Sequence, residues 1–254
     1  MRLLSYNILD GGTDRVPQLA DVISTADADV VALVEADNHD VVTRLASRLG
    51  MDFIFAEGSE HSVALMSRWP IIDSINHTAI DANAGRCLLE ATVVAPNGTE
   101  CPIGVLHLRA HATEAAEHER CEQLNRIRHR FERHRRIGKP HVLCGDFNAN
   151  APTQQIDFDK ASPRTQREAK ENGGDVPRRA IAQMLAHGYT DTLRAFDASY
   201  ADATGTFKTQ YPQQRVDYIF AHSLPADRIV RAWIDNSDRA RDASDHFPVG
   251  VELR

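Results

Sequence analysis

The sequence lacks the features that mark several classes of protein. Its four cysteines are scattered and form no CxxC pair, which argues against a disulfide framework or a zinc–thiolate site. The formal net charge of −7 argues against a protein that coats long nucleic acids through a general basic surface. No apolar run approaches the length of a membrane span, and the strand-like RLLSYNIL after Met1 leaves no room for a signal peptide. We therefore expect a cytoplasmic protein without stable membrane association.

What the sequence has instead is a series of short, β-rich apolar runs. They are RLLSYNIL, DVVALVEA, FIFAE, SVALMS, CLLEATVVA, CPIGVLHL, HVLCG, RVDYIFA, VRAWID and PVGVEL. Helical patterns cover 14–26, 38–49, 114–136 and 177–187. Because the helices do not alternate strictly with the strands, the predicted fold class is α/β, with two mixed β-sheets packed face to face and helices outside. No composition break divides the chain, so residues 1–254 are expected to form a single domain.

Two charged or polar segments border these elements. The predicted helix over 114–136 is rich in arginine and carries an apolar stripe of Cys121, Leu124, Ile127 and Phe131. This pattern places its arginines and glutamates on the opposite face, which a solvated surface explains better than a nucleic-acid stripe. Residues 151–176 contain few periodic apolar positions, which predicts a long loop or a loop with one short helix. Because it follows Asp146 and Asn148, it is expected to border any site there.

A buried strand ends in the stretch HVLCGDFNANAPT, residues 141–153. The apolar VLC run reads as core, and Gly145 with the later turn signals marks its end. In an extended chain Asp146 and Asn148 point to the same side, while Phe147 packs on the other. Two oxygen-bearing side chains would then share one spot. The alternative is an Asx-type turn, in which both bond only the local backbone.

Other strand tips end in the same kinds of side chain. They are Asn7 in LLSYN, Glu35 in VVALVE, His107 with Arg109 and His111 in VLHLRAH, Asp217 in RVDYIFA, and Asp245 with His246 in SDHFPV. Singly, each has an ordinary explanation, such as a turn former, a helix cap or a satisfied core histidine. One shared site explains their joint placement better than a series of coincidences.

Clustered carboxylates repel one another unless a cation neutralises them. The candidate oxygen ligands are Asn7, Glu35, Asp146 and Asn148. This set contains no cysteine, which favours Mg²⁺ or Mn²⁺ over zinc. Beside the metal, His246 as an imidazolium would stabilise charge developing on phosphorus, and Asp217 would hold its tautomer. Asp146, oriented by Asn148, would take the proton of an attacking water, so the parts predict hydrolysis of a phosphate ester.

The motifs SYNI, VVALVE, SVALMSRWPI, VLHLRAH followed by ERCEQ, LCGDFNA, RVDYIF and SDHFPV occur in this order over almost the whole chain. In this combination the sequence resembles the endonuclease/exonuclease/phosphatase superfamily with the deoxyribonuclease-I-like fold. The resemblance implies a four-layer α/β sandwich, a site at one end of the two central sheets, and a divalent metal, usually magnesium. HLRAH with the following R..Q looks closer to the branch of neutral sphingomyelinases and tyrosyl-DNA phosphodiesterases than to the abasic-site repair branch.

The resemblance also implies roles for the site residues. Asn7 and Glu35 would hold the metal, and Asp245 would lie at the metal or a second-metal position. His107 would contact the phosphate, while Asp146 would activate water or help to bind a second metal.

For the remaining positions, the resemblance implies that Asn148 orients the nucleophile and the phosphate, and that Asp217 supports His246. Arg68 and Arg86 fall where the family often has arginine, although strand-edge packing explains them equally well.

The leading hypothesis is a metal-dependent phosphodiesterase, expected to be monomeric, that acts on a small or single-stranded phosphodiester. The nearest alternative is a DNA or RNA endonuclease or exonuclease that uses the local basic residues Arg109, Arg164, Arg167 and Lys170. A phosphomonoesterase, a sphingomyelinase-like lipid hydrolase and a binding module without catalysis are less favoured. Phe207 and Tyr211 either stack on a base or pack their own loop.

Overall fold

Two six-stranded sheets face each other in the computed structural model, which describes residues 1–81, 83 and 85–254. Sheet A contains, in order, β11 (Ile229–Ile234), β12 (Val249–Leu253), β1 (Arg2–Asn7), β2 (Val30–Val34), β4 (Val63–Ser67) and β3 (Asp52–Ala56). Sheet B contains β5 (Ile71–Asn76), β6 (Cys87–Val94), β7 (Glu100–His107), β8 (His141–Asp146), β10 (Asp217–His222) and β9 (Thr190–Asp191). Both sheets are mixed, since β1 pairs in parallel with β2, and β7 with β8.

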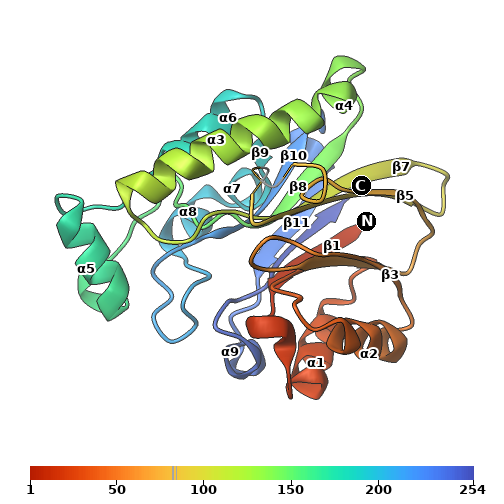
Figure 1. The fold of residues 1–254 in the computed structure, drawn as a ribbon, viewed down its shortest axis with the longest axis horizontal. Helices are drawn as coiled ribbons and strands as arrows, with labels where there is room; N and C mark the ends of the chain where they lie inside the picture. Colours follow the sequence, from red (N-terminus) through yellow and green to blue (C-terminus); the bar gives the residue numbers. More distant parts are fainter. Residues whose placement is uncertain (82, 84) are drawn as a thin grey trace.

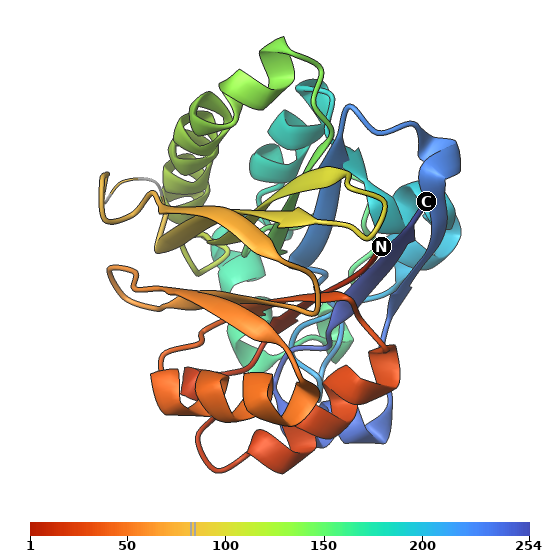
Figure 2. The ribbon, with the colours of Figure 1, turned by 90° about the vertical axis from the view of Figure 1, so that its right-hand side faces the viewer.

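Helices cover the outer faces of both sheets (Figures 1 and 2). The helices α1 (Val16–Ala26) and α2 (His39–Leu49) lie against sheet A, and α3 (Glu114–Arg130) and α6 (Arg179–Ala186) lie against sheet B. The predicted four-layer α/β sandwich is therefore confirmed. That residues 1–254 form one domain stays a prediction. Among the described residues, no helix has the length and apolarity needed to cross a membrane.

Apolar sequence on both faces explains the central strands. Every residue of β2 and β4 is buried, because one face packs against the opposite sheet and the other against helices.

Helix α2 has an equally regular apolar face, and a capping residue in the sequence marks each of its ends. Asn38 caps the first turn by accepting hydrogen bonds from the N–H groups of Asp40 and Val41, and Gly50 ends the helix with a positive φ of 65°.

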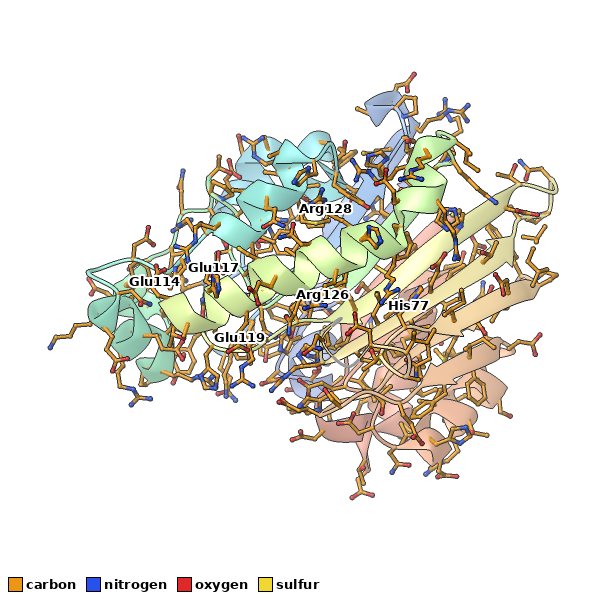
Figure 3. All side chains as sticks on the ribbon, turned by 45° about the horizontal axis from the view of Figure 1, so that its top comes forward. His77, Glu114, Glu117, Glu119, Arg126 and Arg128 are labelled. Atoms are coloured by element: carbon orange, nitrogen blue, oxygen red, sulfur yellow. The ribbon has the colours of Figure 1, made fainter. Side chains whose placement is uncertain are left out.

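The arginine-rich segment departs from its prediction in two ways. The expected single helix is divided at Phe131 into α3 and α4 (Glu132–Arg136). The expected exposure to solvent is wrong for Glu117 and Arg120. Both side chains are fully buried, and Arg120 donates two hydrogen bonds to Glu117. Figure 3 shows Glu114, Glu117, Glu119, Arg126 and Arg128 along this helix.

Several elements were not predicted because they are short or lie at the edge of a sheet. One of them is the edge strand β5, which is half exposed. In the segment 151–176, by contrast, the predicted short helix is present as α5 (Pro163–Glu171), after the 3₁₀ turn Phe158–Lys160. It lies at one end of the molecule in Figure 1. The short helices α7 (Thr192–Phe196), α8 (Ala198–Ala203) and α9 (Asp238–Ala243) were also missed. Two further 3₁₀ turns lie at Asp10–Gly12 and Ala226–Arg228.

Candidate active site

Strand order brings the polar strand tips together in two facing rows. In sheet A the neighbouring strands β12, β1, β2 and β4 place, in this order, His246, Asn7, Glu35 and His61 at one end. In sheet B the neighbouring strands β10, β8, β7 and β6 place Asp217, Asp146, His107 and Arg86 at that end. The two rows meet across the interface between the sheets, so the predicted convergence of strand tips occurs.

A glycine allows β8 to lie close to β7 beside the site. Gly145 has a φ of 136°, and a Cβ atom there would lie 2.0 Å from the carbonyl oxygen of Leu106. Any side chain would therefore push the strands apart. The next residue, Asp146, pairs in register with His107 on one side and with Asp217 on the other. Gly145 thus fixes how deeply Asp146 is set into the site.

The chain turns sharply after Asp146 instead of staying extended. Asn148 has a positive φ of 48°, and its backbone N–H donates to Oδ1 of Asp146 at 2.8 Å. This is the Asx-type turn, and the extended alternative is wrong. The side chain of Asn148 still lines the cavity, while its Nδ2 donates to the carbonyl of Leu108 at 3.1 Å. The turn therefore holds one oxygen of Asp146 and leaves the other facing the site.

Asn7 links the carboxylates at the centre. Its Nδ2 donates to Oε1 of Glu35 at 3.1 Å and to Oδ2 of Asp146 at 3.2 Å, while its Oδ1 accepts from the N–H of Leu9. The N–H of Asp10 donates to the other oxygen of Glu35 at 3.0 Å. In this arrangement Nδ2 of Asn7, and not Oδ1, faces the two carboxylates, so ligation by Asn7 of a metal between them requires its amide to turn over.

His246 and Asp217 form a buried pair. Nδ1 of His246 donates to Oδ2 of Asp217 at 2.9 Å, and Nε2 lies 3.9 Å from Oδ2 of Asp146 and from Oδ1 of Asp245. Burial opposes the charged imidazolium, but the charge and hydrogen bond of Asp217, with Asp146 and Asp245, outweigh it and raise the pKa of His246 to about 10. The ring packs against Phe207, with centroids 4.6 Å apart.

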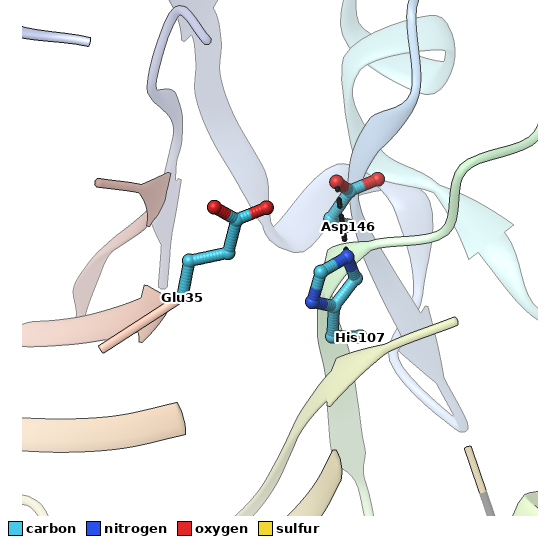
Figure 4. A group of neighbouring side chains, drawn as sticks. All are labelled: Glu35, His107 and Asp146. Atoms are coloured by element: carbon cyan, nitrogen blue, oxygen red, sulfur yellow. Dashed lines mark ion pairs between the residues drawn. The ribbon is translucent and has the colours of Figure 1, made fainter. Parts of the chain in front are cut away.

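Glu35, His107 and Asp146 form a candidate metal site (Figure 4). One ligand atom of each lies within 4.8 Å of the others, and a second such group joins Asp146, Asp217 and His246. Burial, and then the neighbouring charge of Asp217, raises the pKa of Asp146 well above its usual range. A divalent cation would relieve this repulsion, so the donor set fits one.

Two buried atoms near this group have no hydrogen-bond partner among the described residues. They are Nδ1 of His107 and Oδ1 of Asp245. Burial and the positive charge of Arg86 lower the pKa of His107 well below its usual value, so the ring is neutral. A neutral imidazole and an unsatisfied carboxylate oxygen leave donor atoms available for an added ion or a bound water.

The group lies in a cavity of about 300 Å³. The predicted bordering segment supplies one wall through Arg164, Thr165 and Glu168 of α5. Glu168 accepts from His111 at 3.1 Å and from Arg164 at 3.2 Å, which ties α5 to the loop after His107. Phe207 and Lys208 line the cavity as well.

The arginine and glutamine of ERCEQ brace the loop after His107. Arg120 donates to the carbonyl oxygens of Arg109 at 2.8 Å and His111 at 2.6 Å, and Gln123 accepts from the N–H of Arg109 at 3.1 Å. The function of this R..Q pair could not be assigned from sequence. A signal for this role is present in the sequence. Arg120 and Gln123 are three residues apart, so both can reach the same loop, and Arg120 lies on the helix face that carries Leu124 and Ile127.

Three arginines named from the sequence lie at different distances from the site. Arg86 lines the cavity, with Nη1 3.4 Å from Nε2 of His107. Arg109 lies at the rim, paired with Glu60 and Glu119. Arg68 pairs with Asp27 at the far end of β4 and is outside the site.

The comparisons with known proteins agree with this geometry. The model of the endonuclease/exonuclease/phosphatase family matches residues 4–246. An AP endonuclease from Archaeoglobus fulgidus is 19% identical, with a TM-score of 0.77 over 100% of this chain and 99% of that one. The 3′ phosphatase NExo from Neisseria, bound to a product DNA hairpin, is also 19% identical, with a TM-score of 0.76 over 100% and 99%.

The human Nocturnin catalytic domain is 17% identical, with a TM-score of 0.67 over 99% of this chain and 92% of that one. At such identities these likenesses establish the fold alone. No curated protein sequence matches this chain. Because the family model spans nearly the whole sequence, the chain belongs to the endonuclease/exonuclease/phosphatase family, as its motifs predicted, and is a hydrolase of phosphoester bonds.

Proposed function

We propose that this chain is a Mg²⁺-dependent phosphodiesterase that cleaves a small or single-stranded phosphodiester. The observation that carries the proposal is the group of half-buried Glu35 with buried His107 and Asp146, beside the His246–Asp217 pair in one cavity. Mn²⁺ is the alternative ion. When bound, the ion would neutralise the carboxylates and polarise a phosphate oxygen.

The ion would be held by Glu35, with Asp146, Asp245, Asn148 and Asn7 as the further candidates from the sequence. The available oxygen of Asp245 supports its inclusion. Asn7 contributes an oxygen at this place only after its amide turns over, since Nδ2 and not Oδ1 faces the two carboxylates. In the present arrangement its Nδ2 bridges the carboxylates of Glu35 and Asp146.

The chain's own groups divide the work of hydrolysis. Asp146, fixed by the N–H of Asn148, accepts the proton of the attacking water at Oδ2. His246, held at Nδ1 by Asp217, presents Nε2–H to the phosphate oxygen on which charge develops. His107 contacts the phosphate with its neutral ring, and the loop braced by Arg120 keeps this side of the cavity in place.

A nuclease is the second candidate, and a surface feature favours it. Arg86 lines both the cavity and an adjoining hollow of about 240 Å³ that also contains Arg109 and Arg126. These arginines pair with Glu60, Glu119 and Asp81, so a nucleic-acid backbone held along the hollow would replace carboxylates as their partner. Oligonucleotide affinity that falls steeply with salt would support this candidate, and a flat salt dependence would support a small substrate.

The metal assignment has its own test. Replacing Glu35 with alanine is expected to shift the Mg²⁺ titration of diester hydrolysis to higher concentration, because one carboxylate of the candidate metal site is lost. An unchanged titration would remove Glu35 from the metal site. No turnover of any ester by the folded protein at saturating Mg²⁺ or Mn²⁺ would refute the proposed function. The cytoplasmic location and the monomeric state expected from the sequence stay predictions.

A further inference from the structure

A second histidine–aspartate pair lies at the opposite end of the site from His246 and Asp217. Nδ1 of His61 donates to Oδ2 of Asp37 at 2.8 Å, and the other oxygen of Asp37 accepts from the N–H of Ser62 at 2.7 Å. In both pairs a carboxylate accepts from Nδ1 and leaves Nε2 as the free nitrogen. The hydrogen bond of Asp37 raises the pKa of His61, which favours the charged ring that carries a proton on Nε2 as well as on Nδ1. No sequence motif of the chain marks this second pair.

Strand order places the pair beside the candidate metal site. His246, Asn7, Glu35 and His61 follow one another along sheet A, so His61 adjoins Glu35 on the side away from His246. His61 lines the cavity, and its ring centroid lies 5.2 Å from that of His107. Its Nε2 makes no hydrogen bond to any residue that the structure describes.

The loop that carries His61 is closely packed. Gly58 has no room for a side chain, since a Cβ atom would lie 2.0 Å from the carbonyl oxygen of His61 and 2.3 Å from that of Arg86. The N–H of Ser59 donates to the same Arg86 carbonyl at 2.9 Å, and the carbonyl of Ser62 accepts from Ala36 at 2.9 Å. His61 is therefore held in place before any substrate binds.

We propose that His61, oriented by Asp37, is a substrate-binding residue that donates a hydrogen bond from Nε2 to a phosphate oxygen at the end of the cavity away from His246. Arg86 lies at this end as well, with Nη1 3.4 Å from Nε2 of His107 and Nη2 paired with Glu60 at 2.5 Å. His246 and His61 thus lie at the two ends of the row, and both line the substrate cavity. This inference rests on the proposed phosphodiesterase function.

The competing explanation is that the pair only fastens the loop of His61 to the end of β2. Two substitutions separate the explanations. His61→Phe keeps a ring against His107 and removes the donor, while His61→Gln keeps a donor. Asp37→Asn keeps an acceptor for the N–H of Ser62 and removes the charge that orients the ring. The matched control is His118→Ala, which alters an exposed histidine of α3.

The probe is inorganic phosphate, titrated at saturating Mg²⁺ while the ¹⁵N signals of the histidine side chains are followed. We expect phosphate to shift the Nε2 signal of His61. His61→Phe should weaken phosphate binding roughly tenfold or more, the cost of one hydrogen bond to a charged group, and should raise KM for bis-p-nitrophenyl phosphate. His61→Gln should recover part of this loss, Asp37→Asn should give a smaller loss, and His118→Ala should match the parent protein.

Phosphate binding by His61→Phe that equals that of the parent protein would overturn the inference, as would a His61 signal that does not respond to phosphate. Equal losses in His61→Phe and His61→Gln that follow a lowered melting temperature would show that the pair only fastens the loop. A parent protein that hydrolyses no ester but shows the His61 response would refute the proposed function and leave the phosphate site standing. Hydrolysis with an unresponsive His61 would do the reverse.

Discussion

Arg120 is the residue whose loss should show most clearly how the site wall is held. Its side chain is 1% exposed and makes four hydrogen bonds, two to Glu117 and one each to the carbonyls of Arg109 and His111. Replacing it with methionine leaves the buried charge of Glu117 unpaired, at a cost of roughly 3–5 kcal/mol. Each abandoned carbonyl adds about 1 kcal/mol or more if it stays buried.

The expected total, roughly 5 kcal/mol or more, is a large share of the 5–15 kcal/mol by which a typical domain is stable. Urea unfolding followed by circular dichroism measures it. The double variant Glu117→Gln with Arg120→Met removes the unpaired charge while keeping an acceptor for the N–H of Ala180, so it should recover more than half of the lost stability. A loss below about 1 kcal/mol in Arg120→Met would refute the reasoning.

Other substitutions test single contacts. Gly145→Ala should destabilise the chain by roughly 2 kcal/mol or more and lower diester hydrolysis, because its Cβ would meet the Leu106 carbonyl. A variant whose urea unfolding and activity equal those of the parent protein would contradict this. Phe207→Ala should lower kcat through loss of the ring packed on His246, with little change in Mg²⁺ dependence; an unaltered kcat would count against it.

His141 gives the stability a pH dependence, because burial is the main cause that lowers its pKa from 6.5 to about 4. As pH falls, the unfolded chain binds the proton of His141 before the folded chain does. The free energy of unfolding should therefore fall as pH drops from about 6.5 to about 4, by roughly 3 kcal/mol at most. Urea midpoints between pH 7 and pH 4 measure this decline. His141→Gln should flatten it, and an equally steep decline in that variant would contradict the assignment.

The sequence predicted the site best where function depends on strand tips. Apolar runs locate strands well, so Asn7, Glu35, His107 and Asp146 could be placed at the ends of strands that meet. The conformation after Asp146 could not be decided from the sequence, because an Asp–Phe–Asn stretch fits both an extended chain and an Asx turn. Only the positive φ of Asn148 decides between them.

What escaped prediction depends on contacts between distant segments. Asp37 and His61 are 24 residues apart and meet because β2 pairs with β4, which the pattern of apolar residues does not reveal. The burial of Arg120 was missed for a different reason. At 3.6 residues per turn Arg120 lies on the same face of α3 as Leu124 and Ile127, but the many arginines of this segment suggested a solvated face. The folded loop of residues 109–111 presents the carbonyls that require a buried donor there.

The measurement that tests the central claim most directly is hydrolysis of bis-p-nitrophenyl phosphate with Mg²⁺, with Mn²⁺ and with a chelator, and with His246→Ala as the blank. The account predicts metal-dependent cleavage that the chelator abolishes and that His246→Ala lowers by roughly 10² or more while remaining folded. Cleavage that survives the chelator, or near-normal activity of His246→Ala, would contradict it. Activity confined to p-nitrophenyl phosphate would instead identify a phosphomonoesterase.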